Sequence, residues 1–274
     1  MRDNREYKTG GNIDMAKIGF IGMGNMGTAI MRGLLKTYKP EELLFTSAHE
    51  AKMQKITEET GVAHVSTATD CAEQVKYLVL AVKPQVLPTV FKELNGKISK
   101  DQVVISIAAG YAIADLQAGL GDSARIVRSM PNTPAMVGEG MSGVSYDEAL
   151  FTDEEKDVID GFFTSFGKME KVDEKLMDVV GSASGCSPAY VYMFIEALAD
   201  GCVKNGLPRQ AAYKMVAQAV LGSAKMVLET GKHPGELKDM VCSPGGTTIE
   251  GLAALEESGF RGAIIKACDA NFEK

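Results

Sequence analysis

Two glycine-rich stretches of the sequence hold the residues that could bind charged ligands. In the first, Gly22, Gly24 and Gly27 form a G-x-G-x-x-G pattern between an apolar run (18–21) and an amphipathic helical pattern. This context predicts a dinucleotide-binding turn, in which Gly22 makes the tight turn, Gly24 lets the backbone approach a pyrophosphate and Gly27 allows close helix–strand packing. The alternative is a glycine-rich turn without a ligand. The candidate cofactor-binding residues here are Gly22, Gly24, Asn25, Met26 and Gly27.

The second stretch, SPGGTT (243–248), joins two helical patterns. The first N–H groups of a helix lack intrahelical partners and attract anions. Because Gly245 and Gly246 leave those groups unobstructed, the stretch could form a small oxyanion-binding site. The alternative is a plain helix start, in which Thr247 and Glu250 form a capping box. The two interpretations are compatible.

The ends of the expected strands point to a nucleotide as well. Thr46 and Ser47 follow the apolar run 43–45, where a sheet that prefers NAD usually has an acidic residue for the ribose 2′-OH. Hydroxyl groups can donate to a phosphate, whereas a carboxylate would repel it. We therefore expect NADP in preference to NAD. No arginine is near, but Lys52 and Lys55 could help.

Two further apolar runs end in residues suited to a cofactor. Lys83 and Pro84 follow the run 77–82, and small residues at 108–110 follow the run 103–107. Ligands of open parallel sheets lie at the carboxyl ends of the strands. Small residues would let a nicotinamide ring lie flat on the backbone, and the rigid loop PNTPA (131–135) could close over it. Lys83 could equally be a solvent-facing residue at the strand end.

The order of the patterns predicts how these residues are positioned. From residue 17 to about 172, short apolar runs alternate with helical patterns, which is typical of βαβ units and a parallel sheet. From about 173 onward only helical patterns remain. We expect a polar, disordered extension (1–14), a Rossmann-type α/β domain that binds NADP (15–172) and an all-helical domain (173–274) for dimerisation and substrate binding.

Composition argues against several other classes. The 274 residues carry a net charge of −7 without a basic stripe, which argues against binding nucleic acid or an anionic membrane. The apolar runs are too short to span a bilayer, and no signal peptide is visible. Five cysteines without a CxxC pattern and three isolated histidines predict free thiols in a reducing cytoplasm and no metal site.

The motifs together resemble the pyrroline-5-carboxylate reductase family. The resemblance covers residues 15–274 and is carried by GFIGMGNMGTAI, AVKP, SIAAG, MPNTPAMVGEG, GSASGCSPAY and, most specifically, VCSPGGTTIEGLAALE. It implies a Rossmann domain followed by a helical dimerisation domain of the 6-phosphogluconate dehydrogenase C-terminal type. It also implies reduction of 1-pyrroline-5-carboxylate to L-proline, with NADPH preferred and NADH possible, by homodimers that often assemble into a decameric ring.

The resemblance also assigns roles to individual residues. Ser47 matches the residue that faces the adenosine 2′-phosphate, and Thr248 matches a residue that orients the imine as a hydrogen-bond donor or acceptor. The implied cofactor-binding strand ends are Ala81, Val82, Lys83, Pro84, Ile107, Ala108 and Ala109. The implied substrate-binding residues are Glu174, Ser243, Gly245, Gly246, Thr247 and Thr248. Glu174 could equally be a surface residue of a charged run.

Two positions depart from the family pattern. Met240 and Ala68 stand where relatives have Asn, which puts one polar contact at each position in doubt. Two rival functions are weaker. A β-hydroxyacid dehydrogenase would need a lysine on the first helix after the domain junction, and 176–203 contains none. A non-catalytic NADP-binding sensor would have no use for the 243–248 loop.

The helical patterns within 188–230 are apolar most of the way round. A helix of this kind must be covered on several sides. One small helical domain offers few internal partners for so much apolar surface, so we expect at least a dimer.

Overall fold

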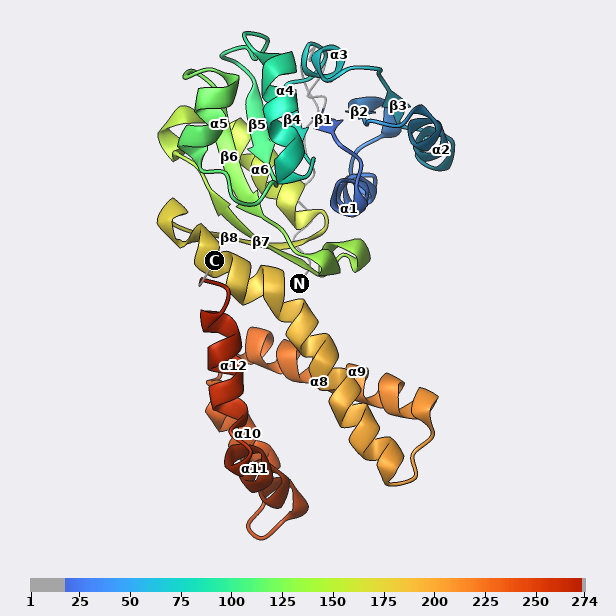
Figure 1. Ribbon diagram of the computed structural model, residues 1–274, viewed down its shortest axis with the longest axis vertical. Coiled ribbons are helices and arrows are strands. Elements are labelled where there is room, and N and C mark those ends of the chain that lie inside the picture. The colour runs from blue at the N-terminus through green and yellow to red at the C-terminus, as the bar shows by residue number, and fades with distance from the viewer. Residues whose placement is uncertain (1–17, 273–274) are drawn as a thin grey trace. The chain divides into compact units, whose positions relative to one another are not determined.

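The computed structural model describes residues 18–272, which form two compact units that divide between Gly185 and Cys186 (Figure 1). The first unit is α/β and the second is all-helical, which confirms the predicted fold class. The predicted boundary after residue 172 lies one residue beyond the last strand, whereas the compact units divide later, between Gly185 and Cys186. The expected extension 1–14 lies outside the described residues.

In the described part of the first unit, eight strands form one sheet in the order β3-β2-β1-β4-β5-β6-β7-β8. They are β1 (Ile18–Ile21), β2 (Leu43–Thr46), β3 (Ala63–His64), β4 (Tyr77–Leu80), β5 (Val103–Ser106), β6 (Arg125–Met130), β7 (Gly140–Ser145) and β8 (Gly167–Lys171). Neighbours are parallel except β6 and β7. The chain changes direction across the sheet between β1 and β4, and ligands of open α/β sheets bind beside such a switch point.

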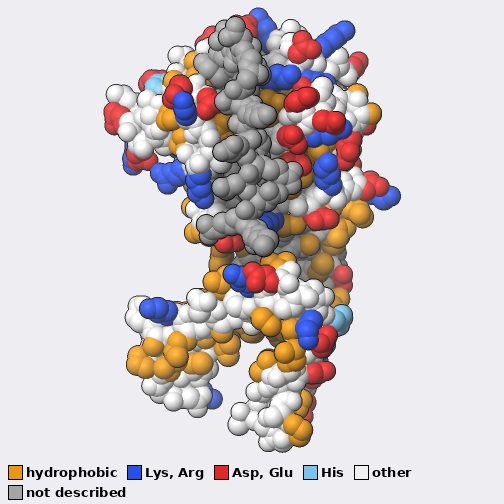
Figure 2. Space-filling view, turned by 180° about the vertical axis from the view of Figure 1, so that it is seen from behind, with side chains coloured by type: hydrophobic (Ala, Val, Ile, Leu, Met, Phe, Trp, Pro, Cys, Tyr) orange, Lys and Arg blue, Asp and Glu red, His pale blue; other side chains and the backbone are white. Residues whose placement is uncertain are grey.

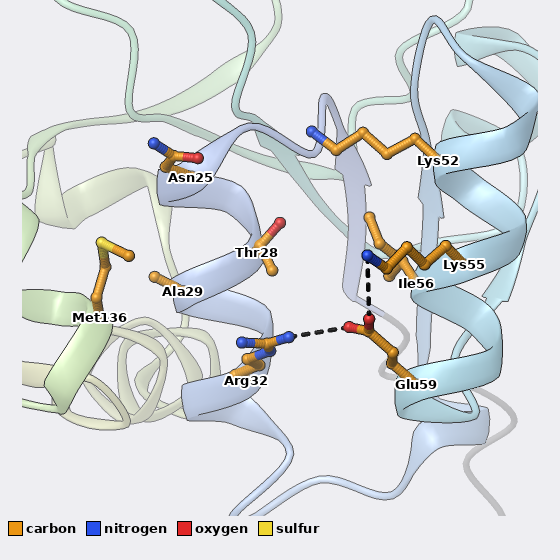
Figure 3. Close-up of a pocket in the computed structure, with 9 residues that line it drawn as sticks. All are labelled: Asn25, Thr28, Ala29, Arg32, Lys52, Lys55, Ile56, Glu59 and Met136. Carbon is orange, nitrogen blue, oxygen red and sulfur yellow. Dashed lines mark hydrogen bonds and ion pairs between the residues drawn. The ribbon is translucent and has the colours of Figure 1, made fainter.

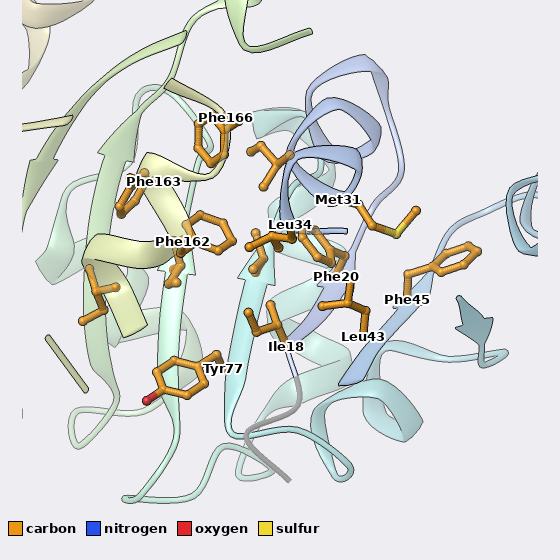
Figure 4. Close-up of a cluster of buried hydrophobic side chains, with 14 of the residues drawn as sticks. Ile18, Phe20, Met31, Leu34, Leu43, Phe45, Tyr77, Phe162, Phe163 and Phe166 are labelled. Atoms are coloured by element: carbon orange, nitrogen blue, oxygen red, sulfur yellow. The ribbon is translucent and has the colours of Figure 1, made fainter. Parts of the chain in front are cut away.

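Six main helices cover the two faces of this sheet. They are α1 (Asn25–Leu34), α2 (Glu50–Thr60), α3 (Ala68–Ala72), α4 (Leu87–Leu94), α5 (Ile113–Leu120) and α6 (Asp153–Thr164). Alternate strand residues point to opposite faces. Phe20 therefore packs in the core under α1, α2 and α6, where the rings of Phe162 and Phe166 also lie (Figure 4). Ile21 packs in the other core, under α3, α4 and α5.

A short helix α7 (Met177–Val180) and a π-helical turn (Gly181–Cys186) follow the sheet. The second unit then consists of α8 (Ser187–Lys204), α9 (Arg209–Thr230), α10 (Pro234–Val241), α11 (Thr247–Glu257) and α12 (Phe260–Asp269). Among the described residues of this unit, the buried hydrophobic core consists of Ala199, Ala212 and Val216. Hydrophobic side chains gather on the surface of these helices instead (Figure 2). Among the described helices, none has the length and apolar character needed to cross a bilayer.

A buried ion cluster joins α6 to the sheet at the end remote from the glycine turn. Glu155 is 4% exposed and lies in the first turn of α6, where Thr152 caps the helix. Arg125 binds both of its carboxylate oxygens at 2.7 and 2.9 Å, and Lys76 lies 2.8 Å from one of them. Burial alone raises the pKa of Glu155, but the hydrogen bonds from Arg125 and Lys76 outweigh burial and lower it to about 2.

We expect Glu155→Gln to lower the free energy of unfolding by about 1.5–3 kcal/mol at pH 7, because it removes a charged partner from two basic groups. The folded-state pKa lies below the ordinary value of 4.5, so this stabilisation is complete above pH 4.5 and is lost as the pH falls toward 2. The variant should therefore lose less stability than the wild type over that interval in urea unfolding.

The exposed pair Lys171–Glu148 provides the control, since its nitrogen and oxygen lie 2.9 Å apart at the surface. Glu148→Gln should leave the unfolding midpoint nearly unchanged. Equal unfolding curves for the wild type and Glu155→Gln would show that the buried cluster does not stabilise the fold.

Candidate functional site

The turn between β1 and α1 is shaped by its glycines. Gly22 has φ +98°, and a Cβ there would lie 2.7 Å from a methyl of Val82 and 2.8 Å from the carbonyl oxygen of Ala81. A Cβ at Gly27 would lie 2.6 Å from the carbonyl oxygen of Gly22. These two glycines therefore allow α1 to start directly at the end of β1.

Gly24 differs from the other two glycines of the turn. A Cβ at this position would meet no atom within 4 Å. Gly24 is the N-cap of α1, and no side chain caps the helix. The position therefore leaves open space beside unpaired N–H groups at a helix start, which is where the pyrophosphate of a dinucleotide is held in such folds. The turn fits a dinucleotide.

A cavity of about 310 Å³ lies beside this turn, over the carboxyl ends of the strands around the switch point. Gly22, Thr46, Ser47 and Val82 line it, so the structure brings together cofactor-binding candidates from three strands. Ser66, Thr67, Thr89 and Glu93 also line it and were missed by the sequence analysis. Ser66 and Thr67 follow β3, whose two residues are too short to show an alternating pattern.

The remaining cofactor-binding candidates lie at the same edge of the sheet. Backbone hydrogen bonds hold the strand ends together: Gly22 donates to Thr46, Ala81 to Ile21 and Ile107 to Leu80. Side-chain environments differ among these candidates. Met26, Ala81 and Ile107 are half-buried against one core, Ala108 is buried in the other, and Lys83 and Ala109 are exposed. Pro84 begins a 3₁₀ turn, and Asn25 faces a second cavity, between α1 and α2 (Figure 3).

In the second unit, the SPGGTT loop forms an open helix start. Gly246 is the N-cap of α11, and its N–H donates to the carbonyl of Ser243 at 3.0 Å. Gly245 has φ +67°, a conformation that favours glycine. Thr247 and Thr248 are the first two helical residues and are exposed. The N–H groups of the first turn and two hydroxyls are therefore accessible together.

The capping box considered above does not form at this helix start. A capping box with Glu250 requires Thr247 to be the N-cap. Gly246 is the N-cap instead, and no side chain caps the helix. Because Gly246 carries no side chain, it leaves the first N–H groups without a local acceptor. A carboxylate ligand could accept from them.

Glu174 lies in the first unit and has partners of its own. One of its carboxylate oxygens accepts from the backbone N–H of Ile113 at 2.6 Å and from Arg128 at 3.1 Å. It thereby holds the start of α5 next to the buried guanidinium of Arg128, whose exposed fraction is 8%. Its substrate contact stays a prediction.

Cys71 is a buried free thiol, and burial raises its pKa to about 12, which keeps this thiol neutral. Among residues 18–272, no group of three or more His, Cys, Asp or Glu side chains is arranged to hold a metal ion.

Comparison with known families gives two matches. The family described as pyrroline-5-carboxylate reductase dimerisation matches residues 174–274. The family described as NADP oxidoreductase, coenzyme F420-dependent, matches residues 17–110. The matches divide between the helical region and the glycine-turn region.

Individual relatives match over nearly the whole chain. The pyrroline-5-carboxylate reductase of Escherichia coli (strain K12) is 46% identical over 260 residues, which are 94% of this chain and 96% of that protein. Its namesake from Arabidopsis thaliana is 43% identical over 253 residues, 92% of this chain and 91% of that protein.

Solved structures agree with these relatives. A pyrroline-5-carboxylate reductase from Coxiella burnetii superposes with a TM-score of 0.87 at 33% identity, covering 94% of this chain and 96% of that chain. The Plasmodium falciparum pyrroline carboxylate reductase, solved with NADP bound, has a TM-score of 0.83 at 34% identity, covering 94% and 97%.

We expect Gly24→Asp to fold as well as the wild type but to weaken NADPH binding at least 100-fold. Asp is a favourable N-cap and its Cβ has open space, so the thermal unfolding midpoint should stay the same or rise. Its carboxylate would repel a pyrophosphate at the same helix start. NADPH fluorescence titration and thermal unfolding measure the two effects.

Gly24→Asn is the neutral control, and it should lose less affinity than Gly24→Asp. Gly27→Ala should instead lower the unfolding midpoint, because its methyl would lie 2.6 Å from a backbone oxygen. Wild-type NADPH affinity in Gly24→Asp would contradict the placement of the pyrophosphate at this turn.

Proposed function

This chain belongs to the pyrroline-5-carboxylate reductase family, and we propose that it reduces 1-pyrroline-5-carboxylate to L-proline with NAD(P)H, the last step of proline biosynthesis. It is an oxidoreductase that acts on a cyclic imine. The observation that carries the proposal is the open start of α11, with a glycine N-cap followed by two threonines. This arrangement suits a small substrate with one carboxylate and one ring nitrogen.

We assign separate tasks to the backbone and the side chains of this loop. The first-turn N–H groups after Gly246 bind the substrate carboxylate, and the Thr248 hydroxyl bonds the ring nitrogen and fixes its orientation. The loop 243–248 contains no acidic side chain. We therefore propose that the imine is reduced in its protonated form, with the proton taken from solvent, and that Thr248 only orients it. When bound, NADPH supplies the hydride.

We propose NADPH as the preferred cofactor, with NADH accepted less well. Thr46 ends β2 and Ser47 follows it, both at the cavity beside the glycine turn, and neither carries a charge that would repel a 2′-phosphate. The Plasmodium falciparum relative was solved with NADP bound.

The dimerisation family that matches 174–274 supports a homo-oligomer. We propose a homodimer as its building block, assembled further into a decameric ring. A cytoplasmic location suits a chain with free cysteines that uses NADPH.

The activity is tested by following NADPH oxidation with 1-pyrroline-5-carboxylate, and separately NADP reduction with a 3-hydroxy acid. We expect only the first reaction, with kcat/KM higher for NADPH than for NADH. Activity with the hydroxy acid alone would support a β-hydroxyacid dehydrogenase, and activity with neither would support a binding protein.

We expect Thr248→Val to lower kcat/KM for the imine by about 1–3 kcal/mol, the cost of a hydrogen bond left unmade in a closed site. Thr248→Ser keeps the hydroxyl and should retain most of the activity. NADPH affinity should be the same in both variants, measured by fluorescence titration. If kcat/KM of Thr248→Val stays within twofold of the wild type, Thr248 does not contact the substrate.

A further inference from the structure

A cavity of about 410 Å³ between α1 and α2 holds three basic side chains (Figure 3). Two of them share one acidic partner: Arg32 lies 3.0 Å and Lys55 lies 3.8 Å from the carboxylate of Glu59. The side-chain ammonium of the third, Lys52, makes no hydrogen bond or ion pair with a residue in the range 18–272. The cavity therefore has one end with paired charges and one cation without a counter-ion.

Lys52 lies at the end of the cavity that adjoins the nucleotide side of the sheet. Figure 3 shows its amino group at the same end as Asn25, whereas Arg32 and Glu59 lie at the opposite end and Thr28 lies between them. Asn25 is the first residue of α1, directly after the glycine turn. An anion that extends from that turn would therefore meet Lys52 before either of the other cations.

The residue that follows Lys52 links α2 to the end of β2. This residue, Met53, is 3% exposed, and its sulfur accepts the backbone N–H of Ser47 at 3.1 Å. This contact fixes the first turn of α2 against the strand end that carries Thr46 and Ser47. The end of β2, with its hydroxyls, is thus in direct contact with the turn of α2 that carries Lys52.

The acidic residue nearest to Lys52 in sequence has another partner. Glu50, on the same turn of α2, lies 3.2 Å from the imidazole of His64 through one oxygen. Thr57 holds the other ring nitrogen of His64 at 2.8 Å. The start of α2 is open as well, because its N-cap, His49, makes no side-chain capping bond.

We propose that Lys52 is the residue that selects a cofactor carrying a 2′-phosphate on its adenosine ribose. The proposal rests on the proposed function. A phosphate monoester carries between one and two negative charges at pH 7. The hydroxyls of Thr46 and Ser47 donate hydrogen bonds but do not offset that charge. Lys52 supplies the missing positive charge through an ammonium that has no carboxylate of the described residues beside it, whereas Arg32 and Lys55 both lie within ion-pair distance of Glu59.

The test compares Lys52→Met with Lys55→Met, which removes the same charge from the same helix one turn later. Adenosine 2′,5′-bisphosphate and adenosine 5′-monophosphate are the probes, with binding to the full chain measured by isothermal titration calorimetry. Lys52→Met should weaken the bisphosphate at least tenfold and the monophosphate less than twofold. Lys55→Met should change neither by more than twofold. Added salt should weaken bisphosphate binding more in the wild type than in Lys52→Met.

Imine reduction by the same proteins separates this proposal from the proposed function. Lys52→Met should lose kcat/KM with NADPH but keep it with NADH. The proposal is overturned if Lys52→Met binds the bisphosphate like the wild type, if Lys55→Met loses as much, or if the wild type does not distinguish the two probes. A wild type that selects the bisphosphate through Lys52 but does not reduce the imine would instead overturn the proposed function alone.

Discussion

The close approach of α1 to the end of β1 is the constraint on which the nucleotide side of the structure depends. The carbonyl of Gly22 and the Cα of Gly27 are so near that no side chain fits at Gly27. This approach lets Ile30, Met31 and Leu34 of α1 reach the core over the sheet. It also brings the helix start to the strand ends. Packing and ligand binding therefore require the same two glycines.

Buried and exposed charged side chains of the first unit differ in how they are paired. Where the acidic side chain is buried, as at Glu155, two basic groups surround it and hold its pKa low. Lys55 of α2 and Arg32 of α1 share Glu59 as an ion-pair partner, whereas the ammonium of Lys52 has no ion-pair partner within residues 18–272. An exposed ammonium stays hydrated at little cost, so leaving it unpaired does not destabilise the fold. Such a group is free to bind an anionic ligand, whereas the ion cluster at Glu155 stabilises the fold.

The sequence predicts the parts of this structure that have strong periodicity. The buried parallel strands read as continuous apolar runs, and the glycine fingerprint falls between β1 and α1 as predicted. The strands β7 and β8 were missed, because glycine and serine in β7 and charged residues in β8 hide an alternating pattern. The i,i+4 spacing of Lys55 and Glu59 on α2 is a sequence signal that distinguishes Lys55 from Lys52. The contact of Arg32 with Glu59 is not readable from spacing, because it follows from how α1 and α2 pack.

The substrate loop depends on a unit that cannot form a sufficient core alone. As far as residue 272, where the description of the chain ends, only three small or medium side chains are buried in its hydrophobic core, whereas Met193, Met215 and Leu228 are 70%, 63% and 82% exposed. Burying an apolar side chain contributes about 1.5–3 kcal/mol to stability. Covering this exposed apolar surface would therefore stabilise the folded unit. The dimerisation family that matches the region agrees with a second copy as the cover. Since a partner that binds only the folded state stabilises it by mass action, we expect the stability of this unit to rise with protein concentration. Because α11 belongs to this unit, we expect assembly to stabilise the helix start that we propose to bind the substrate.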